Sequence, residues 1–378
     1  MRRIAVALLP AWFACGVAAA EEAASRSAAD RVAEAFRGEC ATKAAAAEKA
    51  DKMVVVGRDD WLFFTGELRH VGAGRFWGEE AAKASRATKP ELADPLPAIL
   101  DFKEQLDKLG IELILVPVPP KVFIYPDKLS EKSPAPKLSA RPATTGTAAV
   151  FPRLNTYHQE FYNLLGGKGV KVLDLTGEFL TPRELDKPNG ALYCKTDTHW
   201  SPWGCEVAAR TMAADITKRP WAKAHASPFS TQARTIEITG DLAAALDPRN
   251  AQKEKLPARF VWLTGSKDEA AAPVDRSSPV LVLGDSHALV FNAGGDMHGT
   301  RAGFADQLAA ELGFAVDLIA VRGSGATDAR IALYRQAAED KEYLAKKKVV
   351  VWCFGAREFT ESDGWRKVPV TKPAPGNQ

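Results

Sequence analysis

The chain has 378 residues, enough for one large α/β domain with insertions or for two domains, and 46% of them are hydrophobic, enough for a sizeable core. The formal net charge is +3; without the first twenty residues, which include Arg2 and Arg3, 48 basic residues stand against 47 acidic ones and +1 remains. A charge this small excludes a broad nucleic-acid-binding surface, and an anionic polymer would have to bind through a local patch.

The N-terminus has the pattern of an export signal. Met1-Arg-Arg precedes an apolar run, Ile4–Ala20, which ends in three alanines before an acidic pair. A basic start, an apolar middle and a small-residue end predict a secretory signal peptide over residues 1–20. The run is 17 residues long and contains a proline and a glycine, so it is marginal as a spanning helix. An uncleaved membrane anchor is the alternative.

The following segment predicts a helix, a hairpin and a first buried strand. Residues 21–52 are rich in alanine and charge at helical spacing, which predicts an N-terminal helical segment. A hairpin across Gly57 and an amphipathic helix then precede a buried strand over 111–118. Lys121 and Tyr125 follow the end of that strand, so they could border a ligand site; the alternative is a solvated lysine and a packing tyrosine.

A long loop separates these elements from the next helix. Residues 127–147 are rich in proline, serine and lysine, and they form a candidate lid. The helix predicted from 150 to 165 gathers its apolar residues on one face, and His158 lies off that face, which predicts an exposed side chain. A strand over 170–175 and a short helix lead into a polar loop.

That polar loop contains Asp197-Thr-His199. Ser201 and Pro202 suit the N-cap and first position of the next helix, so the helix should hold the loop in place. A carboxylate two residues from an imidazole can orient the imidazole as a base. The other interpretations are a plain polar loop or half of a metal site. We predict no metal, because the other histidines are scattered.

Residues 228–263 differ from the segments around them in their hydrophobic pattern. Alternation over Thr235–Thr239 and a short apolar run at Phe260–Leu263 predict two strands. We therefore expect a β-rich insertion between the polar loop and the next motif.

That next motif begins with Val280–Gly284, a run that predicts a buried parallel strand. The strand ends in Gly284-Asp285-Ser286. A glycine permits a sharp turn, and a hydroxyl just past the carboxyl end of a strand lies where open α/β sheets bind ligands. We interpret Ser286 as a nucleophile; the alternative is that Asp285 and Ser286 only cap the following helix.

The remaining chain alternates strands and helices, which predicts a parallel sheet. The expected strands are 111–118, 170–175, 280–284, 316–321 and 349–354. Gly323 follows the fourth strand and could donate its backbone N–H to an oxyanion, although a plain turn fits equally. Arg357 follows the last strand and could face the site, or it could be a surface arginine. Residues 361–378 should form a flexible, proline-rich tail.

A serine hydroxyl is a poor nucleophile at neutral pH unless a base removes its proton and a carboxylate orients that base. His199 and Asp197 can supply both functions to Ser286. The backbone N–H groups of Ser286 and Gly323 are the predicted oxyanion donors. We expect His287 to take no part, because neighbouring side chains at a helix start point apart.

Four cysteines follow the predicted signal: Cys40, Cys194, Cys205 and Cys353. In an exported protein they can form disulfides, with three possible pairings. A Cys194–Cys205 bridge would clamp the loop of Asp197 and His199. Cys353 ends an apolar strand and suits a buried thiol.

Together these motifs resemble the SGNH/GDSL hydrolase superfamily, and within it the alginate O-acetyltransferase branch of AlgX/AlgJ-like proteins. In most SGNH enzymes the serine comes first, whereas here Asp197-Thr-His199 precedes Gly-Asp-Ser286, as in that branch. The resemblance covers about residues 50 to 360. The superfamily's oxyanion asparagine has no counterpart after the last strand, and the carbohydrate-binding module of AlgX-type members is not found, so the pattern is nearer the AlgJ type.

The resemblance implies a three-layer SGNH-type sandwich over residues 53–360, with 228–263 as its small β-rich insertion. It also implies an O-acetyltransferase that moves acetyl through a serine acyl-enzyme onto hydroxyls of an exported polysaccharide, alginate or similar. Trp200, Arg357, Lys121 and Tyr125 are the candidate substrate contacts, although the tryptophan suits packing equally well. The alternatives are an acetyl esterase and a non-catalytic polysaccharide-binding scaffold.

The same resemblance implies a location in the periplasm. A nucleotide or coenzyme A motif is absent from the sequence, so no cofactor is expected. A membrane-bound O-acyltransferase is therefore the expected acetyl donor, and other polysaccharide export components are expected partners.

Overall fold

The computed structural model describes residues 12–134, 153–185, 189–222, 228–266 and 274–372, with side chains from residue 28 onward except at 182, 184 and 185. The start of the predicted signal segment and most of the candidate lid at 127–147 lie outside the described residues. Among the helices within these ranges, none combines the length and apolarity needed to cross a membrane.

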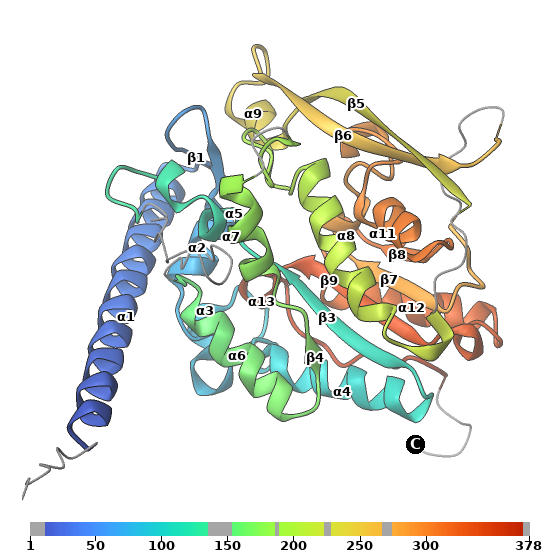
Figure 1. Ribbon diagram of the computed structural model, residues 1–378, viewed down its shortest axis with the longest axis horizontal. Coiled ribbons are helices and arrows are strands. Elements are labelled where there is room, and N and C mark those ends of the chain that lie inside the picture. Colours follow the sequence, from blue (N-terminus) through green and yellow to red (C-terminus); the bar gives the residue numbers. More distant parts are fainter. Residues whose placement is uncertain (1–11, 135–152, 186–188, 223–227, 267–273, 373–378) are drawn as a thin grey trace, which may run out of the picture.

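Five parallel strands form the centre of the molecule, in the order β4-β3-β9-β7-β8 (Figure 1). They are β3 (Glu112–Val118), β4 (Lys171–Val172), β7 (Val280–Gly284), β8 (Asp317–Ala320) and β9 (Val349–Gly355). Every neighbouring pair is parallel. The predicted parallel sheet is confirmed, and edge strand β4 is shorter than expected.

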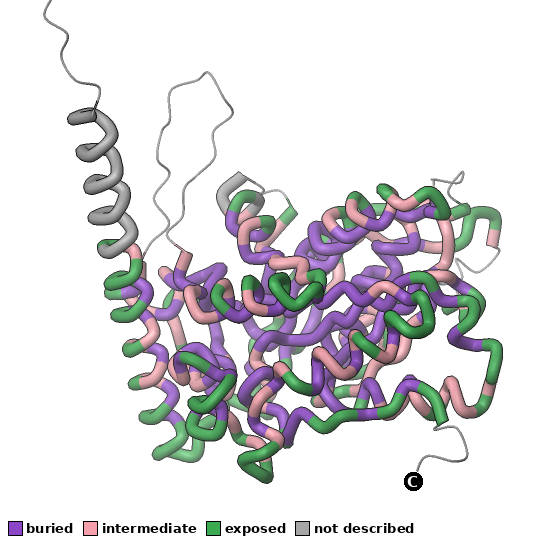
Figure 2. Tube along the Cα trace, turned by 90° about the horizontal axis from the view of Figure 1, so that it is seen from below, coloured by how far each residue is buried: buried purple, intermediate pink, exposed green. Residues whose placement is uncertain are grey.

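Helices cover both faces of the sheet because its strands are apolar on both sides. In β9, Val351 and Cys353 face one core while Trp352 and Phe354 face the other. The first core is packed by α7 (Leu175–Leu185), α8 (Pro202–Ile216) and α11 (Phe304–Leu312). The second is packed by α4 (Pro95–Lys108), α6 (Thr156–Gly167) and α12 (Thr327–Glu339). Figure 2 shows the buried chain running through the middle of the molecule. The helices on both faces of the sheet confirm the three-layer sandwich.

The N-terminal segment packs on the side of this sandwich. It comprises α1 (Trp12–Lys49), the hairpin strands β1 (Val54–Val56) and β2 (Leu62–Phe64), and α2 (Thr65–Gly72). Phe36, Cys40 and Ala44 of α1 are buried. At the crossing with α2, a Cβ on Gly72 would lie 2.7 Å from Cα of Ala41, so the two helices approach closely only because residue 72 is glycine.

Short helices join the main elements: α3 (Ala81–Ala84), α5 (Lys121–Ile124), α9 (Asp241–Leu246), α10 (Ser286–Leu289) and α13 (Glu358–Glu361). The insertion is a hairpin of β5 (Phe229–Thr239) and β6 (Lys253–Leu263), with α9 in the connection between them. The hairpin stands apart from the central sheet and lies over α8 and α11 (Figure 1).

The C-terminal segment corrects the expected flexible tail for residues 361–372. Trp365, Val368 and Val370 are buried. The Trp365 ring stacks on Phe359 with centroids 5.8 Å apart, and its backbone N–H donates to Leu92 O at 2.8 Å. Trp365 and Val370 belong to the second core, which explains the ordered path of this segment. Residues 373–378 lie outside the described part.

His158 is also buried rather than exposed. Its Nε2 lies 2.8 Å from Nε2 of His70, and Nδ1 of His70 lies 2.8 Å from Oγ1 of Thr360. The rings of Phe76, Phe123 and other aromatic residues surround the pair. The apolar face of the predicted helix did not include His158, so the sequence underestimated its burial. In the structure α6 is covered on one side by the sheet and on another by α2.

We expect this histidine pair to make the protein sensitive to acid. Burial lowers the pKa of His158 to about 4 and holds that of His70 well below 6.5. Below pH 6.5 these two histidines therefore bind protons in the unfolded chain but stay neutral in the native state. The free energy of unfolding falls for this reason as the pH drops towards 4. His158 alone accounts for about 3 kcal/mol. Urea unfolding at pH 7.5 and 4.5 should show a smaller loss in His158→Leu; an equal loss in both proteins would contradict this.

Candidate active site

Ser286 lies at the carboxyl edge of the sheet, where β7 meets α10. Asp285 caps this turn: its Oδ1 accepts from His287 N and its Oδ2 from Gly355 N, each at 2.8 Å. A Cβ on Gly284 would lie 2.1 Å from Cys353 O, so the strand can enter the turn only with glycine there. Because Asp285 is the cap, the hydroxyl of Ser286 remains available for chemistry.

The loop of Asp197 and His199 is held at both ends. Tyr193 and Trp200 form an antiparallel bridge across it. Ser201 is the N-cap of α8 and accepts from Gly204 N at 3.2 Å, as predicted. The start of α8 therefore fixes the direction in which the imidazole of His199 points.

The structure brings Ser286, His199 and Asp197 together. His199 Nε2 lies 2.7 Å from Ser286 Oγ, and His199 Nδ1 lies 2.7 Å from Asp197 Oδ1. All three residues are buried, with Ser286 7% exposed. A hydrogen bond from Nδ1–H to the carboxylate leaves Nε2 free to accept the serine proton, which is the arrangement required for nucleophilic catalysis.

Asp197 and His199 each stabilise the charged form of the other. Burial raises the pKa of Asp197, but the charge and hydrogen bond of His199 outweigh it and hold the pKa well below the ordinary value of 3.8. Burial lowers the pKa of His199, but the charge and hydrogen bond of Asp197 outweigh it and raise the pKa above 6.5. The carboxylate is therefore ionised at neutral pH, and the imidazole is a strengthened base.

A family model described as the SGNH hydrolase-like domain of the acetyltransferase AlgX matches residues 54–356. The chain belongs to this family.

Among proteins of known name, the chain is similar in sequence to several probable alginate O-acetylases AlgJ. The Pseudomonas putida protein is 26% identical over 247 residues, which cover 62% of this chain and 54% of the relative. The Pseudomonas syringae protein is 28% identical over 198 residues, which cover 52% of this chain and 42% of the relative. The chain thus spans about half the length of these relatives. Among solved structures, the O-acetyltransferase domain of P. putida AlgJ is similar with a TM-score of 0.56 and 25% identity, covering 81% of this chain and 92% of that one. Pseudomonas aeruginosa AlgX is similar in fold, with a TM-score of 0.51, 18% identity and coverage of 80% and 61%.

Three of the four candidate substrate contacts are buried in this AlgX-family site. Lys121 is 0% exposed and donates through Nζ to the carbonyl oxygens of Leu62, Cys194 and Asp197, at 2.8, 2.9 and 2.5 Å. Its ammonium group therefore holds the loop of Asp197 and His199 in place. Such a lysine resembles a solvated loop residue in sequence, because its partners are backbone atoms from distant segments.

The two aromatic candidates are likewise structural. Tyr125 is 5% exposed, and its hydroxyl accepts from Leu192 N at 2.9 Å. Trp200 is 0% exposed and donates from Nε1 to His287 O at 3.0 Å. Both side chains fill the core behind the loop, as the packing alternative predicted for each of them. Arg357 is the candidate that keeps solvent access.

Gly323 lies in an exposed turn after β8 with a positive φ of 73°. The described contacts do not join it to Ser286, so its role as an oxyanion donor stays a prediction. The four cysteines whose side chains are described, Cys40, Cys194, Cys205 and Cys353, are all free and buried. These four thiols therefore form none of the three possible pairings, including the Cys194–Cys205 clamp on the loop of Asp197 and His199.

His287 lies beside the triad, contrary to the expectation that it would point away. Its ring centroid is 4.9 Å from that of His199, and its Nδ1 is 3.2 Å from Asp285 Oδ1. Burial lowers the pKa of His287 to about 4, so its imidazole is neutral. The short turn of α10 lets both side chains reach the sheet edge.

The sequence did not reveal the residues that hold Asp197 from the other side. Its Oδ2 accepts from Asp241 N at 2.8 Å and from His298 Nε2 at 2.7 Å. Asp241 Oδ1 accepts from Thr198 N at 2.7 Å, and Glu254 accepts from the backbone N–H groups of residues 195 and 196, each at 3.0 Å. Asp241 and Glu254 belong to the inserted hairpin, which therefore supports the loop of Asp197 and His199 directly.

Asp197, His199 and Asp241 also place one ligand atom each within 4.8 Å of one another, the spacing of a possible metal site. These atoms already have partners, however. His199 Nδ1 is bonded to Asp197, and Asp241 accepts from Thr198. A cation would have to displace these hydrogen bonds, so the donor set suits proton transfer better than metal binding.

We expect His298→Leu to slow acyl-enzyme formation about 10- to 100-fold, the value of one hydrogen bond to a buried charge. The reason is that Asp197 loses a partner and His199 loses its fixed orientation. Stopped-flow release of nitrophenol from an acetyl ester measures the rate. His298→Gln keeps a donor and should recover part of it; equal rates in wild type and His298→Leu would show that His298 has no part in positioning Asp197.

Proposed function

We propose that this chain is an O-acetyltransferase that carries acetyl on Ser286 and transfers it to hydroxyls of an acidic exported polysaccharide such as alginate. The observation that carries the proposal is the continuous chain of hydrogen bonds from Asp197 through His199 to Ser286, each 2.7 Å long. It is supported by membership of the AlgX acetyltransferase family and by the alginate O-acetylase names of the relatives.

In the first half-reaction, Ser286 Oγ attacks the carbonyl carbon of the donor ester while His199 Nε2 accepts the hydroxyl proton. The bond between the acetyl carbon and the leaving oxygen then breaks, and His199 returns the proton to that oxygen. Asp197 stays ionised and stabilises the imidazolium. Acetyl is now bound to Ser286 as an ester.

In the second half-reaction, a hydroxyl of the acceptor attacks the same carbonyl carbon. His199 removes the proton of that hydroxyl, and it gives a proton to Ser286 Oγ as the serine ester bond breaks. The products are the acetylated polysaccharide and free enzyme. Water in place of the sugar hydroxyl would give acetate, so the acceptor must be held in line and water kept out.

Both half-reactions pass through a tetrahedral oxyanion. The backbone N–H of Ser286 opens α10 and can donate to it, and Gly323 N–H is the proposed second donor. Each such donor contributes roughly 3 kcal/mol in comparable sites. Arg322 of the same turn pairs with Asp296 at 2.8 Å, which ties this turn to the loop of His298.

The proposed setting is the periplasm, reached through the apolar N-terminal segment. Acetyl-coenzyme A is absent from that compartment, so a membrane-bound O-acyltransferase would deliver acetyl, and other polysaccharide export components would bring the acceptor. Both partners are proposals from the family.

The test supplies p-nitrophenyl acetate with and without oligomers of unacetylated alginate and follows the products by mass spectrometry. Acetylated oligomers that disappear in Ser286→Ala support the transferase. Acetate released at the same rate with and without oligomer would make the protein an esterase. A protein that releases no nitrophenol but binds the oligomers would be a scaffold.

A further inference from the structure

A second pair of aspartate and histidine lies beside His199. In both Asp197-Thr-His199 and Asp285-Ser-His287, the aspartate accepts the backbone N–H of the histidine two residues later, at 2.9 and 2.8 Å. The same carboxylate oxygen lies 2.7 Å from Nδ1 of His199 in the first pair and 3.2 Å from Nδ1 of His287 in the second. The chain thus positions two imidazoles in the same way, with their ring centroids 4.9 Å apart.

His287 offers an acceptor nitrogen that the mechanism above does not use. Its imidazole is neutral, because burial lowers its pKa to about 4, and a neutral imidazole carries one N–H. Nδ1 faces the Asp285 carboxylate, which places the N–H there and leaves a lone pair on Nε2. Nε2 of His199 bonds to Ser286 Oγ at 2.7 Å, whereas no residue in the described ranges bonds to Nε2 of His287.

The glycine at position 355 makes room for this imidazole. A Cβ there would lie 2.9 Å from Cε1 and 3.3 Å from Nδ1 of His287, and 3.1 Å from Nη1 of Arg357. The two side chains therefore border the same small space over the backbone of Gly355. Ser286, His199 and His287 are 7%, 5% and 2% exposed and Arg357 is half-buried, so each of these side chains keeps some contact with solvent.

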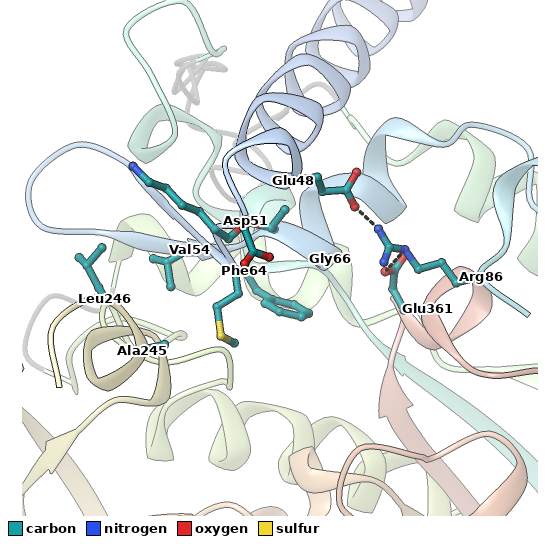
Figure 3. A pocket seen from close by; sticks show the side chains of 12 residues that line it. Glu48, Asp51, Val54, Phe64, Gly66, Arg86, Ala245, Leu246 and Glu361 are labelled. Carbon is teal, nitrogen blue, oxygen red and sulfur yellow. Dashed lines mark hydrogen bonds and ion pairs between the residues drawn. The ribbon is translucent and has the colours of Figure 1, made fainter.

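The larger pocket of about 820 Å³ in Figure 3 is a separate feature. Its described lining residues include neither Ser286 nor His287, and its Arg86 is already ion-paired with Glu48 and Glu361. A contact that orients the reacting sugar must lie within reach of the acetylated serine. The free nitrogen of His287 meets this requirement, and the pocket does not.

We propose that His287 Nε2 accepts a hydrogen bond from the acceptor sugar, from the hydroxyl next to the one that attacks the acetyl group. The attacking hydroxyl gives its proton to His199 Nε2, and the second hydroxyl and His287 keep theirs. Neighbouring hydroxyls of a sugar ring lie close enough together to bond to two imidazoles whose centroids are 4.9 Å apart. This inference rests on the proposed function and adds that the acceptor is a 1,2-diol.

The contact would favour transfer over hydrolysis. A sugar held by one hydroxyl presents the neighbouring hydroxyl to the acetyl carbon in a fixed direction. Water has no second hydroxyl with which to use His287. Loss of Nε2 should therefore slow discharge of acetyl to the sugar and leave discharge to water unchanged.

The test measures how the acyl-enzyme partitions between the acceptor and water. Wild type, His287→Asn and His287→Gln receive p-nitrophenyl acetate and alginate oligomers, and mass spectrometry gives the ratio of acetylated oligomer to acetate, with Ser286→Ala as the background. The asparagine amide takes the place of Nδ1 and can bond to Asp285, whereas the glutamine amide puts an oxygen near the position of Nε2. The ratio does not depend on how fast the acyl-enzyme forms.

The ratio should fall about 5- to 10-fold in His287→Asn, the value of one lost hydrogen bond, and His287→Gln should recover part of it. An unchanged ratio in His287→Asn would overturn the proposal. Equal losses in the two variants would also overturn it, because the effect would then come from the packing of the ring and not from Nε2. Thermal melting checks that each variant is folded.

A second arm tests the class of acceptor with two small alcohols, trans-cyclohexane-1,2-diol and cyclohexanol. The wild-type acyl-enzyme should give more acetyl per hydroxyl to the diol, and this excess should be lost in His287→Asn. Equal yields per hydroxyl, or no product from either alcohol, would overturn the assignment of a 1,2-diol. Wild-type protein that passes acetyl only to water, even with alginate oligomers present, would instead refute the proposed transferase itself.

Discussion

Ser286→Ala should abolish the burst of nitrophenol from an acetyl ester and lower turnover by a factor on the order of 10³ to 10⁶. The reason is that Oγ is the atom that receives the acetyl group, and no other described hydroxyl is bonded to His199 Nε2. The protein should keep its fold, because Asp285 rather than Ser286 supplies the side-chain cap of α10. Stopped-flow spectroscopy measures the burst.

Ser277→Ala is the matched control, since that serine is exposed and, among the described residues, its side chain bonds only to Asp275. It should behave as wild type. A burst of full amplitude in Ser286→Ala would remove this serine from the mechanism, whatever the fate of the other residues.

His199→Ala should have an effect of similar size, because the serine then has no base. In wild type, the rate of acyl-enzyme formation should rise with pH. The pKa of His199 lies above 6.5, and only the neutral imidazole can accept the serine proton. The acid limb of the profile is therefore centred above pH 6.5, and it should be missing from the residual activity of His199→Ala.

A profile that is flat between pH 5 and 8 in wild type would contradict this assignment of the base. His70→Ala is a useful comparison, because that histidine is buried away from the triad and bonds to His158 and Thr360. It is expected to alter stability and to leave the shape of the profile unchanged.

The order of strands and helices could be predicted from the sequence because each strand of the sheet is a short apolar run bounded by turn residues. The same logic located Ser286, since the end of β7 is marked by Gly284 and Asp285. It also located Asp197 and His199, which lie two residues apart and are followed by a helix cap at Ser201. These are local patterns, and the sequence shows them directly.

The rest of the site depends on contacts between segments distant in the chain. The sequence predicted Lys121 as a substrate contact, or else as a solvated lysine, because nothing nearby in sequence shows that it bonds to the carbonyl oxygens of residues 62, 194 and 197. His298 lies 101 residues from Asp197, in a loop without periodicity, and its φ of 67° gives no sequence signal in a histidine. The left-handed backbone conformation of His298 is strained, and such strain is found mainly where a side chain must be held in a particular position.

The inserted hairpin shows the same limit. Its strands could be recognised from the alternation and the short apolar run in the sequence, but these patterns did not show which segments the insertion contacts. In the structure, Asp241 and Glu254 bind the loop that contains Asp197. An insertion far from the triad in sequence is thus part of what keeps Asp197 in position, and the pattern of apolar residues carries no trace of this.

The most direct measurement of the central claim is the location of the acetyl group during turnover. Wild-type protein mixed with an acetyl ester and quenched within the burst should carry one acetyl group, and peptide mapping by mass spectrometry should place it on Ser286. Addition of unacetylated alginate oligomers before the quench should remove acetyl from Ser286 and deliver it to the oligomer. Acetyl found on another residue, or acetyl on Ser286 that only water discharges whatever oligomer is present, would contradict the account.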